Sequence, residues 1–393
     1  MKLRAILCLL CIFLTLTLPG CWDRRELNTL SISHALGIDQ LEDGQVQVSL
    51  QMAKPASMKS SLQKGSSGGG GDEKAFWVVT TTGRTLFEAL RNGRDRISRK
   101  SFFGRNKIII IGEEAAKSGI SPLLDMYIRR VDFRELSFVF VVRGKAQQFI
   151  EADSEQEKEP AKAIENLAEA TDLTSKATKT TLLDVMKALS NETTDPFIAG
   201  LELVELPDSK KKIVKLSDTA VFKEDKLIGW LNEKETRGLL WIIGKVKSGV
   251  IVVESPDDKS KKVALEIINA SSKLKPDFID GKPTMTVHVE ELGNLGEQMS
   301  SINMATPENF KELENRQAEV IREEINAALV KSQTLGIDVF KFGLEFHRKF
   351  PQEYQELKEN WEKEFEKMTV NIEVKAKLNE IGLSVKPIEV DEE

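Results

Sequence analysis

The chain of 393 residues is poor in the side chains from which many catalytic and metal centres are built, with only three cysteines and three histidines. After residue 20 it has no apolar run of the roughly 18 to 20 residues that a membrane-spanning helix needs. We therefore expect no disulfide framework, no thiolate metal cage and no transmembrane helix in the body of the chain, which should be soluble.

The first 20 residues differ in character from the rest. Lys2 and Arg4 precede an apolar stretch from Ala5 to Leu18, which is typical of a signal peptide and too short to cross a bilayer. The stretch ends in Leu-Pro-Gly-Cys at residues 18–21, a pattern similar to the lipobox of bacterial lipoproteins. We predict export, with cleavage before Cys21.

Cys21 would then be the only cysteine of the mature chain, because Cys8 and Cys11 lie in the removed segment. It lacks a partner for a disulfide or a metal cage; a free structural thiol and a catalytic thiol are the weaker alternatives. We predict that Cys21 carries an S-diacylglyceryl group and that its freed amino group can also be acylated. Two acyl chains are enough for stable anchoring on a membrane.

The residues after Cys21 should lie close to the lipid headgroups. Trp22 can place its amphipathic ring at headgroup level. Our hypothesis for the four charged residues that follow is that the arginines meet anionic lipid and the acids meet a partner or each other. These four residues are Asp23, Arg24, Arg25 and Glu26.

The charge balance of the mature chain is acidic. Removal of Lys2 and Arg4 leaves 54 basic against 62 acidic residues, a net charge of −8. Nucleic-acid binding requires a basic surface, so we exclude nucleic acid as a partner. The same balance argues against adhesion to anionic lipid over a wide surface, and leaves the covalent lipid as the main membrane attachment.

The first part of the chain alternates strand and helix patterns. Strands are predicted over 30–40, 45–55, 75–83, 107–112 and 136–144, with the run Ile108–Ile111 suited to a strand buried on both faces. Helices are predicted over 85–98 and 180–196, and a helix pair broken at Gly119 and Pro122 is predicted over 113–132. The glycine-rich stretch 64–74 is predicted to be a flexible hairpin loop, because no Gly-Lys-Ser/Thr follows as in a phosphate loop.

We predict a mixed α/β (α+β) multi-domain fold, with several β-sheets flanked by helices. The polar segment 207–212 suggests a linker. The expected parts are the signal peptide (1–20), an N-terminal α/β domain (21–205), a small middle domain (206–256) and a C-terminal α+β domain (257–393). In the last, 282–292 is a strand that alternates through Met285, Val287 and Val289. Thr306 and Pro307 then open a long helix that Gly336 ends, Asp338 caps the next helix, and 369–382 is a period-2 strand.

The search for catalytic chemistry finds little. His34, His288 and His347 lie in different segments without a second ligand at metal-binding spacing, so no metal site is predicted. His34 follows Ser31 and Ser33 but lacks a nucleophile-elbow motif. The adjacent acids Glu113-Glu114 and Glu290-Glu291 should point away from each other, unlike the paired carboxylates of a glycosidase.

Four stretches together resemble the Ger(x)C family, the lipoprotein C-subunits of spore-germination nutrient receptors. They are GCWDRRELNTLSISHALGID, FFGRNKIIIIGEEAAKSGI, DTAVFKEDKLIGWL and GIDVFKFGLEFHRKFPQEYQELKENWEKEF. The resemblance implies a three-domain architecture, lipidation of Cys21, no enzymatic activity and no cofactor. It also implies a place on the outer face of the inner spore membrane of a Gram-positive endospore former, beside integral-membrane A- and B-type subunits.

The leading hypothesis is therefore a non-catalytic, membrane-anchored lipoprotein subunit of a germinant receptor, needed for receptor assembly or signalling. Two alternatives stay open. One is a surface hydrolase acting on cell wall or lipid, suggested by the many acids and the export signal. The other is a solute-binding lipoprotein of a transporter.

Overall fold

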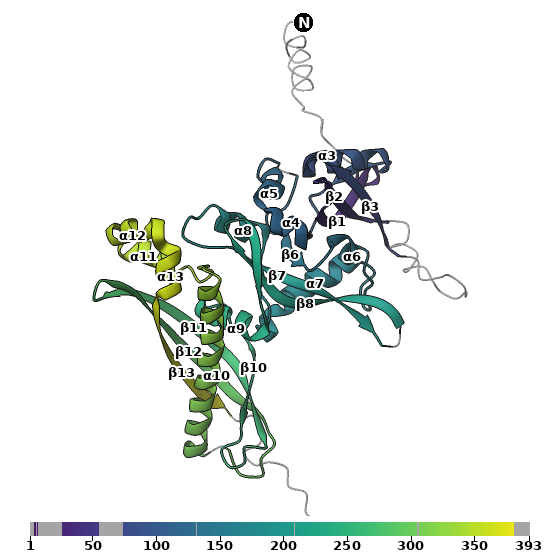
Figure 1. The fold of residues 1–393 in the computed structure, drawn as a ribbon. Helices are drawn as coiled ribbons and strands as arrows, with labels where there is room; N and C mark the ends of the chain where they lie inside the picture. Colours follow the sequence, from purple (N-terminus) through teal and green to yellow (C-terminus); the bar gives the residue numbers. More distant parts are fainter. Residues whose placement is uncertain are drawn as a thin grey trace, which may run out of the picture.

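The structure is a computed structural model that describes residues 26–54, 74–130, 132–207, 209–304 and 306–380, together with residues 4 and 6. Its helices and strands form two β-sheets with helices packed on them (Figure 1). The elements of the first part are η1 (Leu27–Thr29), β1 (Leu30–Gln40), β2 (Val46–Ala53), β3 (Phe76–Gly83), α3 (Leu86–Asn92), η2 (Gly93–Asp95), β4 (Lys100–Phe102), β5 (Ile108–Gly112), α4 (Glu113–Ser118), α5 (Ser121–Ile128), β6 (Phe138–Val142), α6 (Ala146–Ile150), α7 (Pro160–Thr174), α8 (Leu182–Leu189), β7 (Phe197–Leu206), β8 (Ser209–Lys223) and β9 (Lys226–Leu231).

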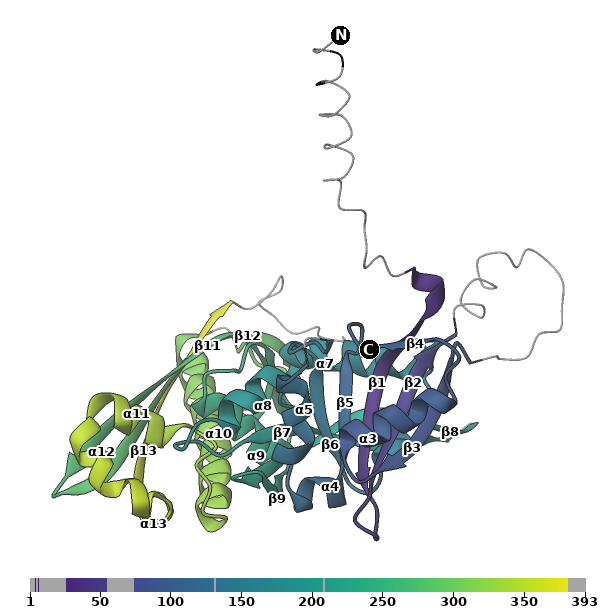
Figure 2. The same ribbon diagram turned by 90° about the horizontal axis from the view of Figure 1, so that it is seen from above.

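The second part follows with a helix and then a separate sheet. Its elements are α9 (Glu233–Ile242), β10 (Gly249–Glu254), β11 (Lys262–Ile279), β12 (Lys282–Gln298), α10 (Pro307–Thr334), α11 (Phe342–Lys349), α12 (Pro351–Leu357), η3 (Lys358–Asn360), α13 (Trp361–Lys367) and β13 (Thr369–Glu380). The molecule is elongated, with α3 near one end and α11 to α13 near the other (Figure 2).

The first sheet has nine strands in the order β3-β2-β1-β5-β6-β7-β8-β9, with β4 paired to the start of β1. Its centre is parallel, from β1 through β5 and β6 to β7, and its two flanks are antiparallel hairpins. Helices cover both faces. Ile109 and Ile111 pack on the face that carries α3, α4, α5 and α8, whereas Ile108 and Ile110 pack against α6 and α7. This two-sided burial explains the uninterrupted apolar run.

The second sheet has four strands in the order β10-β11-β12-β13, antiparallel except for the parallel pair β12–β13. One face is covered by α10, which lies along the sheet, and by α9. Met285, Val287 and Val289 of β12 are fully buried, as their alternation predicts. The other face is open, since Val250 and Val252 of β10 are 50% and 55% exposed.

Most of the predicted elements are confirmed, including the start of the long helix α10. Thr306 caps α10 by accepting a hydrogen bond from the Asn309 amide, and Gly336 follows its end with φ of 64°. The prediction for 113–132 is confirmed as the helix pair α4 and α5, with the break at Gly119 and Ile120. Pro122 instead lies inside the first turn of α5.

The linker predicted over 207–212 is wrong, because β7 and β8 pair as one long antiparallel hairpin across this point. The strands of 206–256 are divided between the two sheets: β8 and β9 extend the first, and β10 belongs to the second. The division of the chain into the domains 21–205, 206–256 and 257–393 stays a prediction. The glycine-rich stretch 64–73 lies outside the described residues. Within the part of the chain that is described, no helix is long and apolar enough to span a bilayer.

Candidate functional site

Of the residues predicted to meet the membrane, the structure describes only Glu26, which directly precedes the elements of the first sheet. Cys21, Trp22, Asp23, Arg24 and Arg25 lie outside the described residues. Glu26 is described, and it bonds locally: its carbonyl accepts hydrogen bonds from the Thr29 amide and hydroxyl, and its carboxylate from the Asn28 side chain at 3.3 Å. These contacts form the short helix η1, which leads directly into β1.

Strand β1 connects this segment to the centre of the first sheet. It pairs with β2 on one edge and with β4 and β5 on the other. Leu30, its first residue, lies opposite Lys100 of β4. Residues 27–29 therefore lead into the middle of the nine-stranded sheet without an intervening loop.

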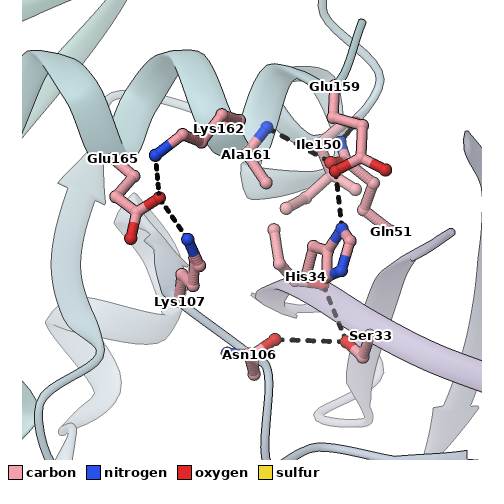
Figure 3. A network of polar contacts seen from close by, with 11 residues as sticks. Ser33, His34, Gln51, Asn106, Lys107, Ile150, Glu159, Ala161, Lys162 and Glu165 are labelled. Atoms are coloured by element: carbon pink, nitrogen blue, oxygen red, sulfur yellow. Dashed lines mark hydrogen bonds and ion pairs between the residues drawn. The ribbon is translucent and has the colours of Figure 1, made fainter. Parts of the chain in front are cut away.

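Ser33 and His34, on β1, have separate partners (Figure 3). The buried Ser33 hydroxyl contacts the Asn106 side-chain oxygen at 3.1 Å, whereas His34 Nδ1 lies 2.6 Å from the Glu159 carboxylate beside α7. Neighbouring residues of a strand point to opposite faces, so the two side chains do not form a nucleophile–base pair.

The same network fastens α7 to the sheet. Lys107 and Lys162 both contact the Glu165 carboxylate, at 2.5 and 2.9 Å. Burial raises the pKa of Glu165, but the hydrogen bonds from the two lysines outweigh it, and the pKa is lowered overall. Gln51 adds two hydrogen bonds to the network, one to the Ile150 carbonyl and one from the Ala161 amide (Figure 3). These contacts position α6 and α7 against the first sheet.

The other candidate groups from the sequence are also explained by structure. Glu290 is exposed and Glu291 is buried, on opposite faces of β12 as predicted. His288 lies beside the carboxylates of Glu290 and Glu373. Among the described residues, no group of three His, Cys, Asp or Glu side chains is arranged to hold a metal ion.

The two sheets are joined at a polar junction that sequence reasoning missed. Asp195, just before β7, accepts a hydrogen bond from the Asp338 amide at 3.0 Å, and its own amide donates to the Asp338 carbonyl. The Asp338 carboxylate accepts hydrogen bonds from the amides of Phe342 and Gly343 at the start of α11, and from the Trp361 indole. The N-cap residue of α11 is nevertheless Lys341 and not Asp338 as predicted, because the helix begins only at Phe342. Burial raises the pKa of Asp338 to about 6.

A cavity of about 690 Å³ opens beside this junction, between the end of α7, α8, the end of α9 and the start of α11. Thr178 and Thr180 line it from one side and Ile242 and Leu274 from the other. Its size falls in the range of small-molecule sites, which often lie between two domains. The sequence carries no local signal for it, because its walls come from segments far apart in the chain.

A second hollow of about 240 Å³ lies at the start of β4. Its lining includes the basic residues Arg91, Arg94 and Lys100. The sequence did contain a signal for this site: the 17 residues from Arg91 to Lys107 hold seven basic residues and one acid. Only the fold shows that several of these cations surround one hollow.

Two family models match the chain. Residues 23–203 match the model described as the spore germination protein N-terminal domain, and residues 217–382 match the model described as spore germination B3/GerAC like, C-terminal. The two matches cover most of the chain, and the short segment 204–216 between them lies inside the β7–β8 hairpin.

Individual relatives agree. Spore germination protein KC of Bacillus subtilis (strain 168) is 27% identical, over 98% of this chain and 98% of its own length. Spore germination protein B3 of the same organism is 23% identical, over 94% of this chain and 96% of its own. The crystal structure of the GerBC protein shares the fold, with a TM-score of 0.58 and 19% identity over 91% of this chain and 99% of that one. The chain therefore belongs to the GerAC-like C-subunit family of spore germination proteins, as the four sequence stretches predicted.

Proposed function

We propose that the chain is a non-catalytic lipoprotein subunit of a spore nutrient-germinant receptor, fastened through lipid on Cys21 to the outer face of the inner spore membrane. The observation that carries this proposal is Cys21 itself. It is the only cysteine after residue 20, it directly follows a signal-like apolar segment, and it occurs in a chain of the germination C-subunit family. Its partners would be the integral-membrane A- and B-type subunits.

The architecture supports a role in assembly or signalling over one in chemistry. Leu30, at the start of β1, is nine residues from Cys21 and sits in the central part of the first sheet. A lipid on Cys21 would therefore hold a folded body close to the membrane, where subunits embedded in the bilayer can reach it.

The test is Cys21→Ala in a strain that lacks paralogous receptors for the same nutrient. We expect loss of the lipid mass, release of the protein from the membrane fraction, and nutrient germination at least about tenfold slower, since a single-site anchor is lost. Germination with dodecylamine should be unchanged. The matched control is Cys11→Ala, which changes a cysteine of the removed segment and should leave all three measurements normal. A normal nutrient response in Cys21→Ala spores would contradict the proposal.

A second candidate function, solute binding, is favoured by the junction cavity of about 690 Å³. Equilibrium dialysis of the purified chain against radiolabelled amino acids and sugars tests it. Saturable binding that is lost in Ala188→Trp, which places a large ring in the cavity wall, would support this function. Equal behaviour of the two proteins would leave the cavity without a ligand role.

A further inference from the structure

The hollow at the start of β4, which we name the anchor-end pocket, combines cations with aromatic rings. Its basic residues are Arg91, Arg94, Lys100 and Arg130. Arg130 is paired with Asp132, an acid that also lines the pocket. The other three are exposed, and in the part of the chain that the structure describes they have no carboxylate partner. Three positive charges are therefore available to an anion.

The aromatic side chains give the pocket an apolar floor and rim. Phe103 and Phe133 stack with their ring centroids 4.8 Å apart, and both line the pocket. Phe87 is 41% exposed and lies within cation–π distance of Arg91 and Arg130. Ile128, at the end of α5, is 68% exposed. Exposed apolar side chains among cations are typical of surfaces that dip into a membrane interface.

The pocket lies at the end of the molecule that leads to Cys21. Strand β4 runs parallel to β1 and pairs with its first residues, so the two strands begin together (Figure 2). Strands β5 and β6 are parallel to β1 as well, which brings the segments before them, with Arg105 and Arg134, to the same end. Leu30 lies nine positions after Cys21; a chain of that length spans at most about 30 Å.

Positive charge is concentrated here although the mature chain is acidic. The segment from Arg91 to Lys107 has a formal charge of +6, against −8 for residues 21–393. An overall acidic protein is repelled by an anionic membrane except where its cations gather, so the local cluster also selects an orientation.

We propose that the anchor-end pocket binds the phosphate-bearing headgroups of anionic phospholipids, with Arg91, Arg94 and Lys100 holding the phosphate and Phe87 and Ile128 entering the interface. Arginine suits this task because its planar guanidinium can donate two hydrogen bonds to one phosphate. The amino ends of the parallel strands then face the bilayer. This inference rests on the proposed function, because the membrane in question is the one to which Cys21 would be fastened.

Hydrogen–deuterium exchange on the full chain, reconstituted into vesicles, tests this inference. One set of vesicles is pure phosphatidylcholine and the other contains phosphatidylglycerol. We expect amide exchange in 91–102 and 126–134 to slow by about tenfold with phosphatidylglycerol only, as several cations engage the surface. Exchange in the β10–β11 turn, 255–261, should be equal in both. Equal exchange of the pocket segments in both lipids overturns the proposal.

The triple variant Arg91→Glu, Arg94→Glu and Lys100→Glu should lose the lipid-dependent protection. The matched control reverses three exposed lysines of the second sheet, Lys273, Lys275 and Lys377, and should keep it. The comparison of the two lipids uses the unchanged chain, so the test stands even if the triple variant folds poorly.

Additional measurements distinguish an anionic lipid from other possible ligands of the pocket. Protection by inorganic phosphate with phosphatidylcholine vesicles, at the level that phosphatidylglycerol produces, would mean a site for free anions and would overturn the proposal. Protection that requires co-reconstituted A- and B-type subunits would mean a protein partner and would overturn it too. Mass spectrometry of the same sample reads the lipid on Cys21. An unmodified Cys21 contradicts the proposed function, whereas lipidated protein without pocket protection contradicts this inference alone.

Discussion

The two sheets of the molecule bury their apolar side chains in different ways. In the first sheet, consecutive residues of a central strand are all inaccessible, because helices cover both faces. In the second, alternate residues of β10 are buried and exposed, because α9 and α10 cover one face only. In a sheet covered on both faces, a substitution at any position of a central strand should lower stability. In a sheet covered on one face, only substitutions on the covered face should do so, and the other face stays exposed.

The largest loss of stability is expected from a substitution at the contact between α9 and α10, the two helices that cover the second sheet. A Cβ atom on Gly238 of α9 would lie 1.9 Å from the Glu324 carbonyl oxygen of α10, a backbone atom that cannot move alone. We expect Gly238→Ala to lower the free energy of unfolding by about 3 kcal/mol or more, measured by urea denaturation. Gly296→Ala is the control, since its Cβ would meet nothing closer than 3.4 Å. A loss below about 1 kcal/mol would show that the two helices can separate freely.

Four valine-to-alanine variants test the difference between the sheets directly. Val141 and Val142 of β6 are both fully buried, on opposite faces, so each change should cost about 2 kcal/mol. In β10, Val253→Ala should cost as much, because Val253 is 4% exposed, whereas Val252→Ala at 55% exposure should cost less than about 0.5 kcal/mol. Thermal and urea unfolding provide the measurement. Equal costs for Val252 and Val253 would mean that the open face is covered in solution.

Glu291 makes the second sheet sensitive to pH. Burial beneath α10, with a further contribution from nearby Glu314, raises its pKa to about 8, and Gln317 only partly offsets this. Since the folded pKa is above the unfolded value, its contribution to stability is present below about pH 4.5 and is lost as pH rises towards 8.

Glu291→Gln removes the ionisation, so the stability of this variant relative to the unchanged chain should rise between pH 5 and 8, by at most about 1.4 kcal/mol per pH unit. Denaturation curves at four pH values measure it. Glu290→Gln, on the exposed face of the same strand, should show no such slope. Parallel pH profiles for the Glu291 variant and the unchanged chain would refute the assignment.

The smallest expected effect comes from the helix caps, one in each part of the molecule. Thr181 caps α8 in a reciprocal capping box with Asp184, whereas Thr306 caps α10 with one hydrogen bond. We expect Thr181→Ala to cost about 1 to 2 kcal/mol and Thr306→Ala about 1 kcal/mol in unfolding free energy. Serine at either position should restore most of the loss, and failure of that rescue would point to packing of the threonine methyl instead.

Local patterns predicted much of this fold. The run Ile108–Ile111 indicated a strand buried on two faces, and the alternation through Met285, Val287 and Val289 indicated a strand buried on one. The prediction of a linker from the polar segment 207–212 was wrong. The same types of polar residue occur in linkers and in the turns of hairpins, so the sequence did not distinguish the two. The parallel pairing of β13 with β12 could not be predicted from local patterns either, since α10 to α13 separate the two strands along the chain.

The candidate sites divide in the same way. The role predicted for Cys21 rests on its neighbours in the chain alone, because a lipobox-like sequence is a local pattern. The anchor-end pocket could be predicted only in part. The excess of basic residues from Arg91 to Lys107 can be counted in the sequence, but the pocket also includes Arg130 and Phe133, which come from another segment. The contact between Asp195 and Asp338 has no sequence signal, since each looks like an ordinary cap or turn residue.

By itself the sequence determined the family, the type of most helices and strands, and a cysteine suited to lipid attachment. These depend on residues close together in the chain, where hydrogen-bonding period and side-chain type act locally. Only the tertiary structure decided which strands are neighbours, which sheet has an open face, and which cations meet at the end of the first sheet where β1 begins. Those features depend on contacts between distant segments, which no local pattern encodes.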